Sequence, residues 1–343
     1  MTFDKTVIHH MNMPYAIGTL GFGTEHSVVC ATEDHGPVVR IAPPFRQARA
    51  FLPGPGGCMA LVSDPERSGE LYAVMGCFVG YKFQGGGIYW TRAPHEGECT
   101  AVRILDLPFA HRIGLARRGA ARYLLAANLA ADKKDAADWT SPGGVYAARL
   151  DGVADTPLQL QPVLTGIHKN HGFLMANLEG KPSLLIGAAE GLIAVDLGAG
   201  ATDKEWPSRQ VLAQETSELA VFDVDGDGAD ELITIEPFHG NTLRAYRKSG
   251  KSWKAFWDAE LEFGHCVLAG MFDGGRSIIV SNRAGNRDLL LFQFDADSAK
   301  PRRVVVDAGA GAANMIVLGH GGRDHLFAAN QAAGEIVMYT RST

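Results

Sequence analysis

The chain has 343 residues, 46% of them hydrophobic and 20% charged, which is typical of a folded globular protein and excludes a disordered chain or a fibre. A net charge of −6 without a Lys/Arg cluster argues against a nucleic-acid partner, and no apolar run approaches the roughly 20 residues of a membrane span. The start "MTFDKTVIHHMNMPY" lacks a secretory signal, and the five cysteines are scattered, so we expect a cytoplasmic protein with reduced thiols and no membrane contact.

Short apolar segments rich in Val, Ile, Leu and aromatic residues follow one another along the chain, separated by Gly, Asn and Asp. Such segments predict β-strands. No stretch shows sustained helical periodicity. The strands that we expect, in chain order, are residues 5–11, 71–76, 86–90, 102–107, 123–129, 143–150, 157–164, 183–190, 191–197, 209–214, 231–236, 254–260, 277–282, 288–294, 302–308, 325–331 and 335–340.

A repeat organises these strands. Each unit begins with a marker residue and an apolar strand, a turn follows eight positions later, and two further strands come next. The markers lie 32 to 60 residues apart and are His26, Cys58, His111, His171, Ser217, His265 and Asn314. A period near 50 residues with about four strands per unit indicates a β-propeller. Seven markers predict seven blades in one all-β domain over residues 1–343.

The two ends of the chain predict how the ring closes. The last blade runs out of chain after "EIVMYTRST", before it has an outer strand. The N-terminal "KTVIHHM" resembles the outer-strand segment "RRVVVDA" and can supply the missing strand. Closure by strands from both termini removes exposed sheet edges. A two-domain α/β alternative would need helices that the sequence does not show.

Four of the seven markers are histidines: His26, His111, His171 and His265. In a propeller the innermost strands line a central channel, so these side chains are predicted to converge at one axial mouth. One interpretation is that water fills a polar channel in which histidine is tolerated. The other is ligation of a divalent transition metal, Mn, Zn, Fe or Ni, because imidazole suits these ions.

The loops between the second and third strands of each blade should reach the same face as the markers. Among their residues, Tyr81, Lys82, His239 and Arg283 are candidate catalytic groups, because they can act as acid, base or carboxylate clamp. Amides, cations and aromatic residues around a metal are typical of a site for a small carbohydrate.

The segment "VFDVDGDGADELIT" places Asp223, Asp225 and Asp227 in alternation, with Glu231 completing the series. Carboxylates spaced in this way surround a hard cation in calcium-binding loops. The spacing resembles the FG-GAP or VCBS repeat of integrin-type propellers. We expect a structural calcium ion here, on the face opposite the histidines, or a plain Asp-rich turn.

Most of the chain, through "TEHSVV", "KNHGF", "FGHCVLAG" and "DVDGDGADE", resembles the propeller portion of fungal aldos-2-ulose dehydratase. It resembles the propeller polysaccharide lyases more distantly, including oligogalacturonate and ulvan lyases. The resemblance implies β-elimination on a sugar, with a histidine base and a divalent cation near the axis. His26, His111, His171 and His265 are the residues with counterparts. The rim carries few arginines, which disfavours long anionic polymers.

The hypothesis is a metal-dependent carbohydrate lyase or dehydratase that abstracts a proton next to a carbonyl of a small keto-sugar or short oligosaccharide. Isomerase or epimerase chemistry at the same site stays open, because the same enolate serves it. A non-catalytic propeller that binds a sugar or a protein is the competing class, since fold alone does not decide function. A propeller lactonase ranks lowest, because lactonases usually hold calcium with Asn, Asp and Glu.

Overall fold

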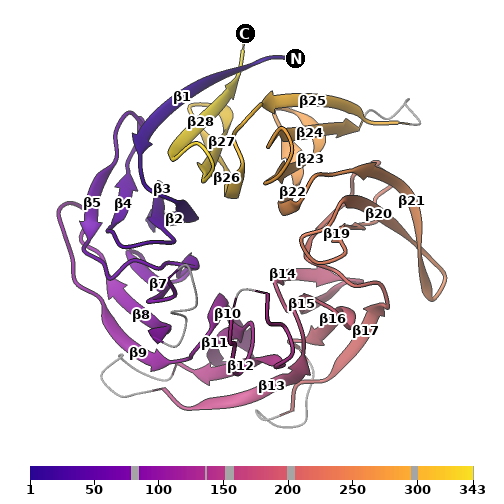
Figure 1. The fold of residues 1–343 in the computed structure, drawn as a ribbon, viewed down its shortest axis with the longest axis horizontal. Coiled ribbons are helices and arrows are strands. Elements are labelled where there is room, and N and C mark those ends of the chain that lie inside the picture. The colour runs from indigo at the N-terminus through magenta and orange to yellow at the C-terminus, as the bar shows by residue number, and fades with distance from the viewer. Residues whose placement is uncertain (79–84, 136, 151–157, 199–204, 295–299, 343) are drawn as a thin grey trace.

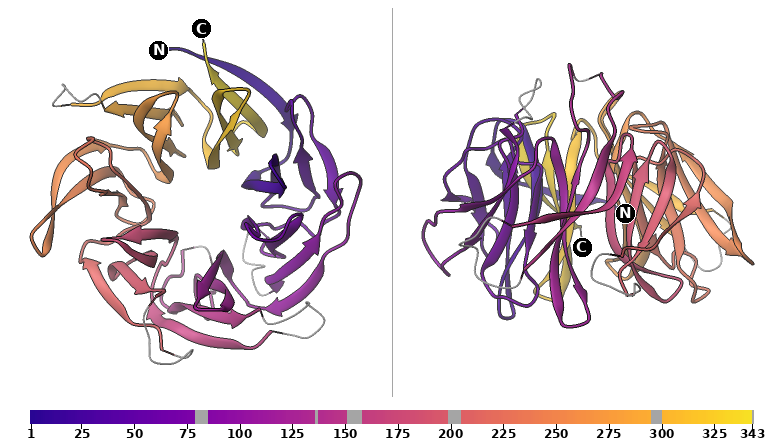
Figure 2. Two further views of the ribbon diagram at one scale, coloured as in Figure 1. Left: turned by 180° about the vertical axis from the view of Figure 1, so that it is seen from behind. Right: turned by 90° about the horizontal axis from the view of Figure 1, so that it is seen from below.

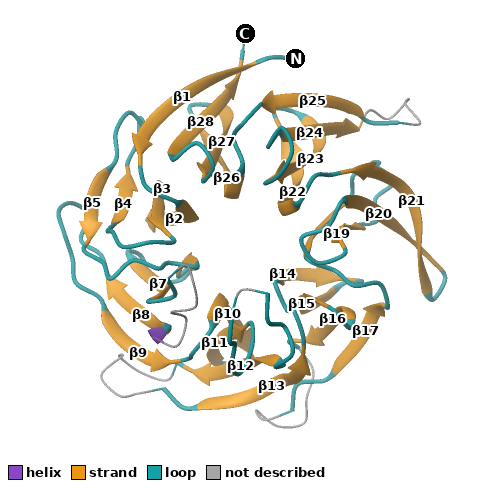
Figure 3. Cartoon of the chain, viewed as in Figure 1, coloured by secondary structure: helices purple, strands orange, loops and turns teal. Residues whose placement is uncertain are grey.

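The structure, a computed structural model, describes residues 1–78, 85–135, 137–150, 158–198, 205–294 and 300–342. Its strands form seven four-stranded antiparallel sheets, which stand around a common axis as the blades of a propeller (Figure 1). A turn at Gly85 is the one helical feature in the described ranges (Figure 3), and no helix among them is long and apolar enough to span a membrane. The predicted all-β, seven-bladed fold is confirmed.

The first three blades use consecutive strands from the axis outward. Their strands are β2 (Pro14–Phe22), β3 (Glu25–Thr32), β4 (Val38–Ile41) and β5 (Arg49–Leu52); β6 (Ala60–Ser63), β7 (Glu70–Met75), β8 (Gly87–Arg92) and β9 (Val102–Asp106); and β10 (Ala110–Arg118), β11 (Ala121–Asn128), β12 (Gly143–Arg149) and β13 (Leu160–Ile167).

The next three blades repeat the order, and the seventh takes its outer strand from the N-terminus. Their strands are β14 (Gly172–Leu178), β15 (Lys181–Ala188), β16 (Gly191–Asp196) and β17 (Ser208–Leu212); β18 (Glu218–Phe222), β19 (Glu231–Glu236), β20 (Thr242–Ser249) and β21 (Ser252–Glu260); β22 (Gly264–Phe272), β23 (Gly275–Asn282), β24 (Leu289–Phe294) and β25 (Arg302–Asp307); and β26 (Ala312–His320), β27 (Arg323–Asn330), β28 (Glu335–Arg341) and β1 (Phe3–His10).

Burial follows the position of a strand within its blade. The second strands β7 and β19 are buried at every residue, because blades pack face to face and cover both sides of their middle strands. The outer strand β21 is half-buried or exposed throughout. This is why middle strands appear in the sequence as apolar runs such as "LYAVM" of β7, whereas outer strands mix polar and apolar residues.

The predicted closure by the N-terminal strand is confirmed. β1 pairs antiparallel with β28, and the two chain ends lie side by side (Figures 1 and 2). Side chains reinforce the closure, because Lys5 Nζ on β1 lies 2.9 Å from both Asp307 Oδ2 of the sixth blade and Glu335 Oε2 of the seventh. The buried Tyr339 hydroxyl donates to Asp307 Oδ2 at 2.6 Å and accepts from Asn330 Nδ2 at 2.6 Å.

One marker was placed wrongly. His26 was predicted to begin the innermost strand of the first blade, but it is exposed near the start of β3, the second strand. The innermost strand is β2, in which Tyr15 precedes the turn at Gly23 by eight residues. The other six markers each lie within two residues of the start of an innermost strand. The first blade is therefore complete, and its short interval came from starting one strand late.

We expect Tyr339→Phe to lower the free energy of unfolding by about 1–3 kcal/mol, because Asp307 and Asn330 lose a buried hydrogen-bond partner. Urea denaturation followed by circular dichroism measures the change. Tyr72→Phe is the matched control, since Tyr72 is 3% exposed and its hydroxyl forms no hydrogen bond with any residue of the described ranges. Equal effects of the two substitutions would contradict this account of closure.

Candidate functional site

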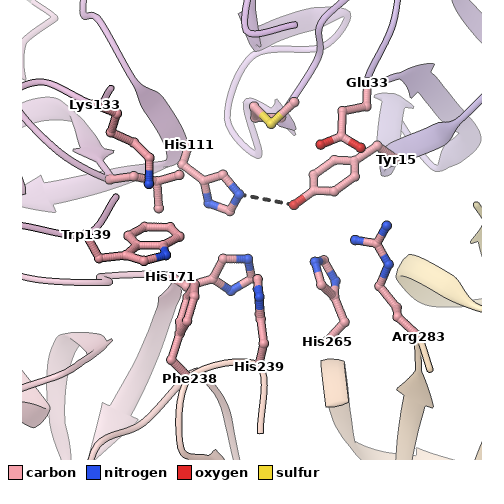
Figure 4. Close-up of a pocket in the computed structure, with 12 residues that line it drawn as sticks. Tyr15, Glu33, His111, Lys133, Trp139, His171, Phe238, His239, His265 and Arg283 are labelled. Atoms are coloured by element: carbon pink, nitrogen blue, oxygen red, sulfur yellow. Dashed lines mark hydrogen bonds between the residues drawn. The ribbon is translucent and has the colours of Figure 1, made fainter. Parts of the chain in front are cut away.

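A pocket of about 290 Å³ opens on the axis, at the end of the ring where the innermost strands begin. Two groups of residues line it, one from the starts of these strands and one from the loops that follow the second strands. The first group includes Tyr15, His111, His171 and His265, and the second includes Glu33, Lys133, Trp139, Phe238, His239 and Arg283 (Figure 4).

Irregular pairing at the start of the innermost strands turns side chains toward this pocket. The register between first and second strands shifts by one residue at Tyr15, at His111 and at His265. Such a β-bulge re-aims the extra residue away from the regular alternation of the sheet. His171 holds the same place in the fourth blade, directly before β14. The repeat thus brings residues far apart in the sequence to one ring of positions.

Three histidines form a group that can hold a metal ion. One ring nitrogen from each of His171, His239 and His265 lies within 4.8 Å of the others. The ring centroids are 4.8 Å apart for His171 and His239, 5.2 Å for His171 and His265, and 5.1 Å for His239 and His265. Three imidazoles around an open position are a donor set that suits Zn²⁺ and neighbouring transition metals.

A buried carboxylate stands behind His171. Glu218 Oε1 lies 2.7 Å from His171 Nδ1 and accepts a hydrogen bond of 2.8 Å from Arg112 Nη2. The three residues come from the fifth, fourth and third blades. Burial opposes ionisation of Glu218, yet the charge of Arg112 and the contact with His171 hold its pKa below the usual value. The contact lacks the geometry of a hydrogen bond, because His171 Nδ1 has no hydrogen-bond partner in the described ranges. The negative charge of the carboxylate still favours a hydrogen on Nδ1, which leaves Nε2 as the atom with a lone pair.

His265 and His239 differ in what surrounds their ring nitrogens and in their backbone conformation. His265 Nδ1 is 2.8 Å from the carbonyl oxygen of Ala313; only an N–H can bond to a carbonyl, so Nε2 keeps its lone pair. His239 has a backbone φ of 46°, a left-handed conformation that is costly outside glycine and clusters at functional sites. Its buried Nε2 has no hydrogen-bond partner in the described ranges.

His111 and Tyr15 form a separate pair at the edge of the histidine group. The His111 ring lies 4.6 Å from that of His171, but its Nε2 is 3.1 Å from the Tyr15 hydroxyl (Figure 4). Its Nδ1 is buried without a partner among the described residues. The group of converging ring nitrogens does not include His111, and the His111–Tyr15 pair has the spacing required for proton transfer.

Burial keeps these groups uncharged. Burial and neighbouring positive charges lower the pKa of His239 to about 2 and hold the pKa values of His111 and His265 well below their usual value. Burial also raises the pKa of Tyr15. At neutral pH the imidazoles are neutral and offer lone pairs, while the tyrosine keeps its proton.

The long loop of the third blade reaches across the fourth blade to the fifth. Trp139 of this loop packs edge-on against Phe238 with ring centroids 4.7 Å apart. Lys133 Nζ lies 3.2 Å from the centre of the Trp139 ring. Burial lowers the pKa of Lys133 to about 8, against the opposing charges of Asp138 and Asp135. This loop gives the pocket an aromatic wall and one of the two cations that line it in the described part of the chain.

The structure tests the placement of the predicted residues. It brings His111, His171, His239, His265 and Arg283 to one pocket. It places His26 elsewhere, because the segment "TEHSVV" belongs to a second strand whose first residues lie at the opposite end of the blade. The predicted candidates Tyr81 and Lys82 lie outside the described residues.

Three important residues were missed in the sequence. Tyr15 could have been found, because it precedes Gly23 by the same eight-residue spacing that identified the other markers. Arg112 and Glu218 directly follow the markers His111 and Ser217, but no local pattern reveals that residues 106 positions apart form a buried ion pair.

The aspartate-rich loop lies between β18 and β19, away from the pocket. Oxygens of Asp223, Asp225 and Asp227 approach within 4.8 Å of one another. Two arginines contact them: Arg276 Nη1 lies 3.2 Å from Asp223 Oδ2, and Arg247 pairs with Asp225.

Glu231 supports this loop from within the blade. It is fully buried, and its Oε2 accepts from the Val224 N–H at 3.0 Å. Burial and the charge of Asp225 raise its pKa to about 7. Structural calcium at this loop stays a prediction.

Comparisons with known proteins bear on the fold. No protein-family model and no curated protein matches the chain. Solved structures do match. BBS1N in complex with ARL6DN is 13% identical, and the match covers 99% of this chain and 95% of that chain with a TM-score of 0.61. A candidate 6-phosphogluconolactonase from Bacteroides fragilis is 14% identical, with 97% of this chain and 91% of that chain covered and a TM-score of 0.60, and Saccharomyces cerevisiae Sqt1 is 11% identical, with 100% and 99% of the two chains covered and a TM-score of 0.57. At these identities the likeness shows the propeller fold alone, and none of the comparisons supports membership of the FG-GAP or dehydratase families.

We expect Glu218→Ala to lower the free energy of unfolding by about 3–5 kcal/mol, because it leaves Arg112 buried without its counter-ion. Glu179→Ala is the control. Glu179 pairs with Arg209 at the surface, where an ion pair contributes about 0–1 kcal/mol. Urea denaturation of both variants measures the difference. Equal small losses would show that the Arg112–Glu218 pair does not hold the blades together.

Proposed function

We propose that this protein is a metal-dependent enzyme that acts on a small polyhydroxylated carbonyl compound by proton abstraction and β-elimination. The observation that carries the proposal is the group His171, His239 and His265, whose ring nitrogens converge on an open pocket. His171 contacts Glu218 and His265 contacts the carbonyl oxygen of Ala313. Contacts of this kind orient ligating histidines in metal sites.

A divalent ion held by these three histidines would polarise a carbonyl or hydroxyl oxygen of the substrate. The chain's own residues supply proton transfer. His111 is neutral and able to accept a proton, and Tyr15, 3.1 Å away, keeps a proton that it can donate. In the elimination the C–H bond next to the carbonyl breaks, its electron pair forms a C=C bond, and the adjacent C–O bond breaks. The departing hydroxide takes up the proton that was removed from carbon and leaves as water.

The polar lining supports a carbohydrate as the substrate class. Trp139 and Phe238 present aromatic surface, while Glu33, Lys133 and Arg283 present charged groups around the same cavity. Apolar walls with a few convergent polar groups are typical of small-molecule sites. Isomerisation or epimerisation begins with the same proton abstraction, so product analysis separates these outcomes from elimination.

We expect the wild-type protein to bind about one Zn²⁺ or Co²⁺ per chain, with His171→Ala and His265→Ala reducing binding to near zero because each removes a ligand. Elemental analysis and cobalt absorption spectra measure this. His26→Ala is the matched control and should retain the metal, since His26 is exposed on β3. Undiminished metal in the His171 and His265 variants would refute the ligand assignment, and a metal-free wild type would favour a non-catalytic binding propeller.

We expect Tyr15→Phe and His111→Ala to lower kcat by about 10²–10⁴, the usual contribution of a positioned acid or base. Ultraviolet absorbance of the conjugated product, over a panel of aldoses, ketoses and sugar acids, measures turnover. Metal content should be unchanged in both variants, because neither residue belongs to the three-histidine group. Wild-type rates in both variants would rule out the pair as the proton-transfer groups.

A further inference from the structure

Arg283 is a cation that shares the pocket lining with the carboxyl group of Glu33. It lies in the loop between β23 and β24, where its backbone N–H donates to Phe263 O at 2.9 Å. Figure 4 shows its guanidinium beside the His265 ring, directed toward Tyr15 and Glu33. Within the described ranges its guanidinium forms no hydrogen bond and no ion pair. Arg112, whose side chain is largely buried at 13% exposure, is by contrast engaged by Glu218.

The carboxylate that faces Arg283 is already bound elsewhere. Glu33 Oε2 accepts a hydrogen bond of 2.6 Å from Gln331 Nε2. Burial raises the pKa of Glu33, and the charge of Arg283 opposes this shift without reversing it. Neither a hydrogen bond nor an ion pair joins these two described side chains, so Glu33 does not engage the guanidinium by direct contact. A fork of N–H donors left open at a pocket wall fits the oxygens of a carboxylate or phosphate, which it can bind through two parallel hydrogen bonds.

The net charge of the pocket favours an anionic ligand. The charge of Arg112 is balanced by Glu218. Among the described lining residues, Arg283 and Lys133 are positive, at opposite ends of the view in Figure 4, and Glu33 is the one carboxylate. A bound divalent ion would add to this positive potential, which attracts anions.

The size of the pocket limits the ligand to one small molecule. Its volume of about 290 Å³ lies just below the roughly 300–1,000 Å³ found for small-molecule sites. The Trp139 and Phe238 rings close one side of it. A single sugar unit suits such a space, whereas a polysaccharide needs an extended groove.

We propose that Arg283 binds an oxyanion of the substrate, a carboxylate or a phosphate carried by a single sugar unit, next to the three-histidine group. This inference rests on the proposed function in taking the anion to belong to the substrate. It narrows the substrate class from small carbohydrates in general to sugar acids or sugar phosphates. The guanidinium positions the substrate and takes no part in proton transfer.

Calorimetric titration of the metal-loaded protein tests the proposal with matched probes. Hexuronates and hexose 6-phosphates are each compared with the parent hexose, and inorganic phosphate is titrated alone. We expect one anionic class to bind at least tenfold more tightly than the neutral parent. Arg283→Gln should reduce this preference by about tenfold to a hundredfold, as for loss of a charge-assisted hydrogen bond, and leave binding of neutral sugars unchanged.

Arg287→Gln is the matched control, because Arg287 is exposed on the same loop and should not affect the preference. The carboxylate and phosphate arms identify the source of the oxyanion. Equal binding of charged and neutral probes, no binding of any anion, or an Arg283→Gln variant that keeps the preference would each overturn the assignment. Anion preference without turnover of any probe would contradict the lyase proposal and leave the oxyanion subsite standing.

Discussion

The contact of Glu218 with both Arg112 and His171 is the interaction on which the pocket depends. It joins three consecutive blades at the axis, where Glu218 Oε1 lies 2.8 Å from Arg112 Nη2 and 2.7 Å from His171 Nδ1. A buried pair of this kind adds little to stability compared with apolar packing, but removal of one partner is costly. It therefore fixes the relative position of the three blades and the orientation of the His171 ring. These two in turn determine which side of the pocket stays open.

The propeller supplies the remaining geometry through repetition. Every blade begins at the same end of the axis, so a bulged residue at the start of an innermost strand points to a shared centre. His111 and His265 are bulged in this way. His239 comes from a loop of the fifth blade instead, which shows that both kinds of segment at this face contribute to one group. The residues at the starts of the innermost strands and in the loops after the second strands determine the chemistry of such a fold, while packing of the apolar middle strands stabilises the propeller.

The sequence was sufficient for the fold and for part of the site. Apolar runs and an eight-residue turn spacing identify the blades, because these features are local. His26 was misplaced because a polar residue before an apolar run marks a first or a second strand equally well, and Tyr15 was overlooked for the same reason. His239 was recognised as a candidate proton carrier, whereas its ring nitrogen lies with those of His171 and His265. Which imidazoles meet depends on side-chain direction and on distant partners such as Glu218, which no local pattern contains.

The most direct measurement of the central claim is an anomalous difference map from crystals grown with Zn²⁺. The account predicts a single strong peak on the axis, bonded to ring nitrogens of His171, His239 and His265, with His111 still paired to Tyr15. A map without density at that position, or with the ion bound only at the aspartate-rich loop of Asp223, would contradict it.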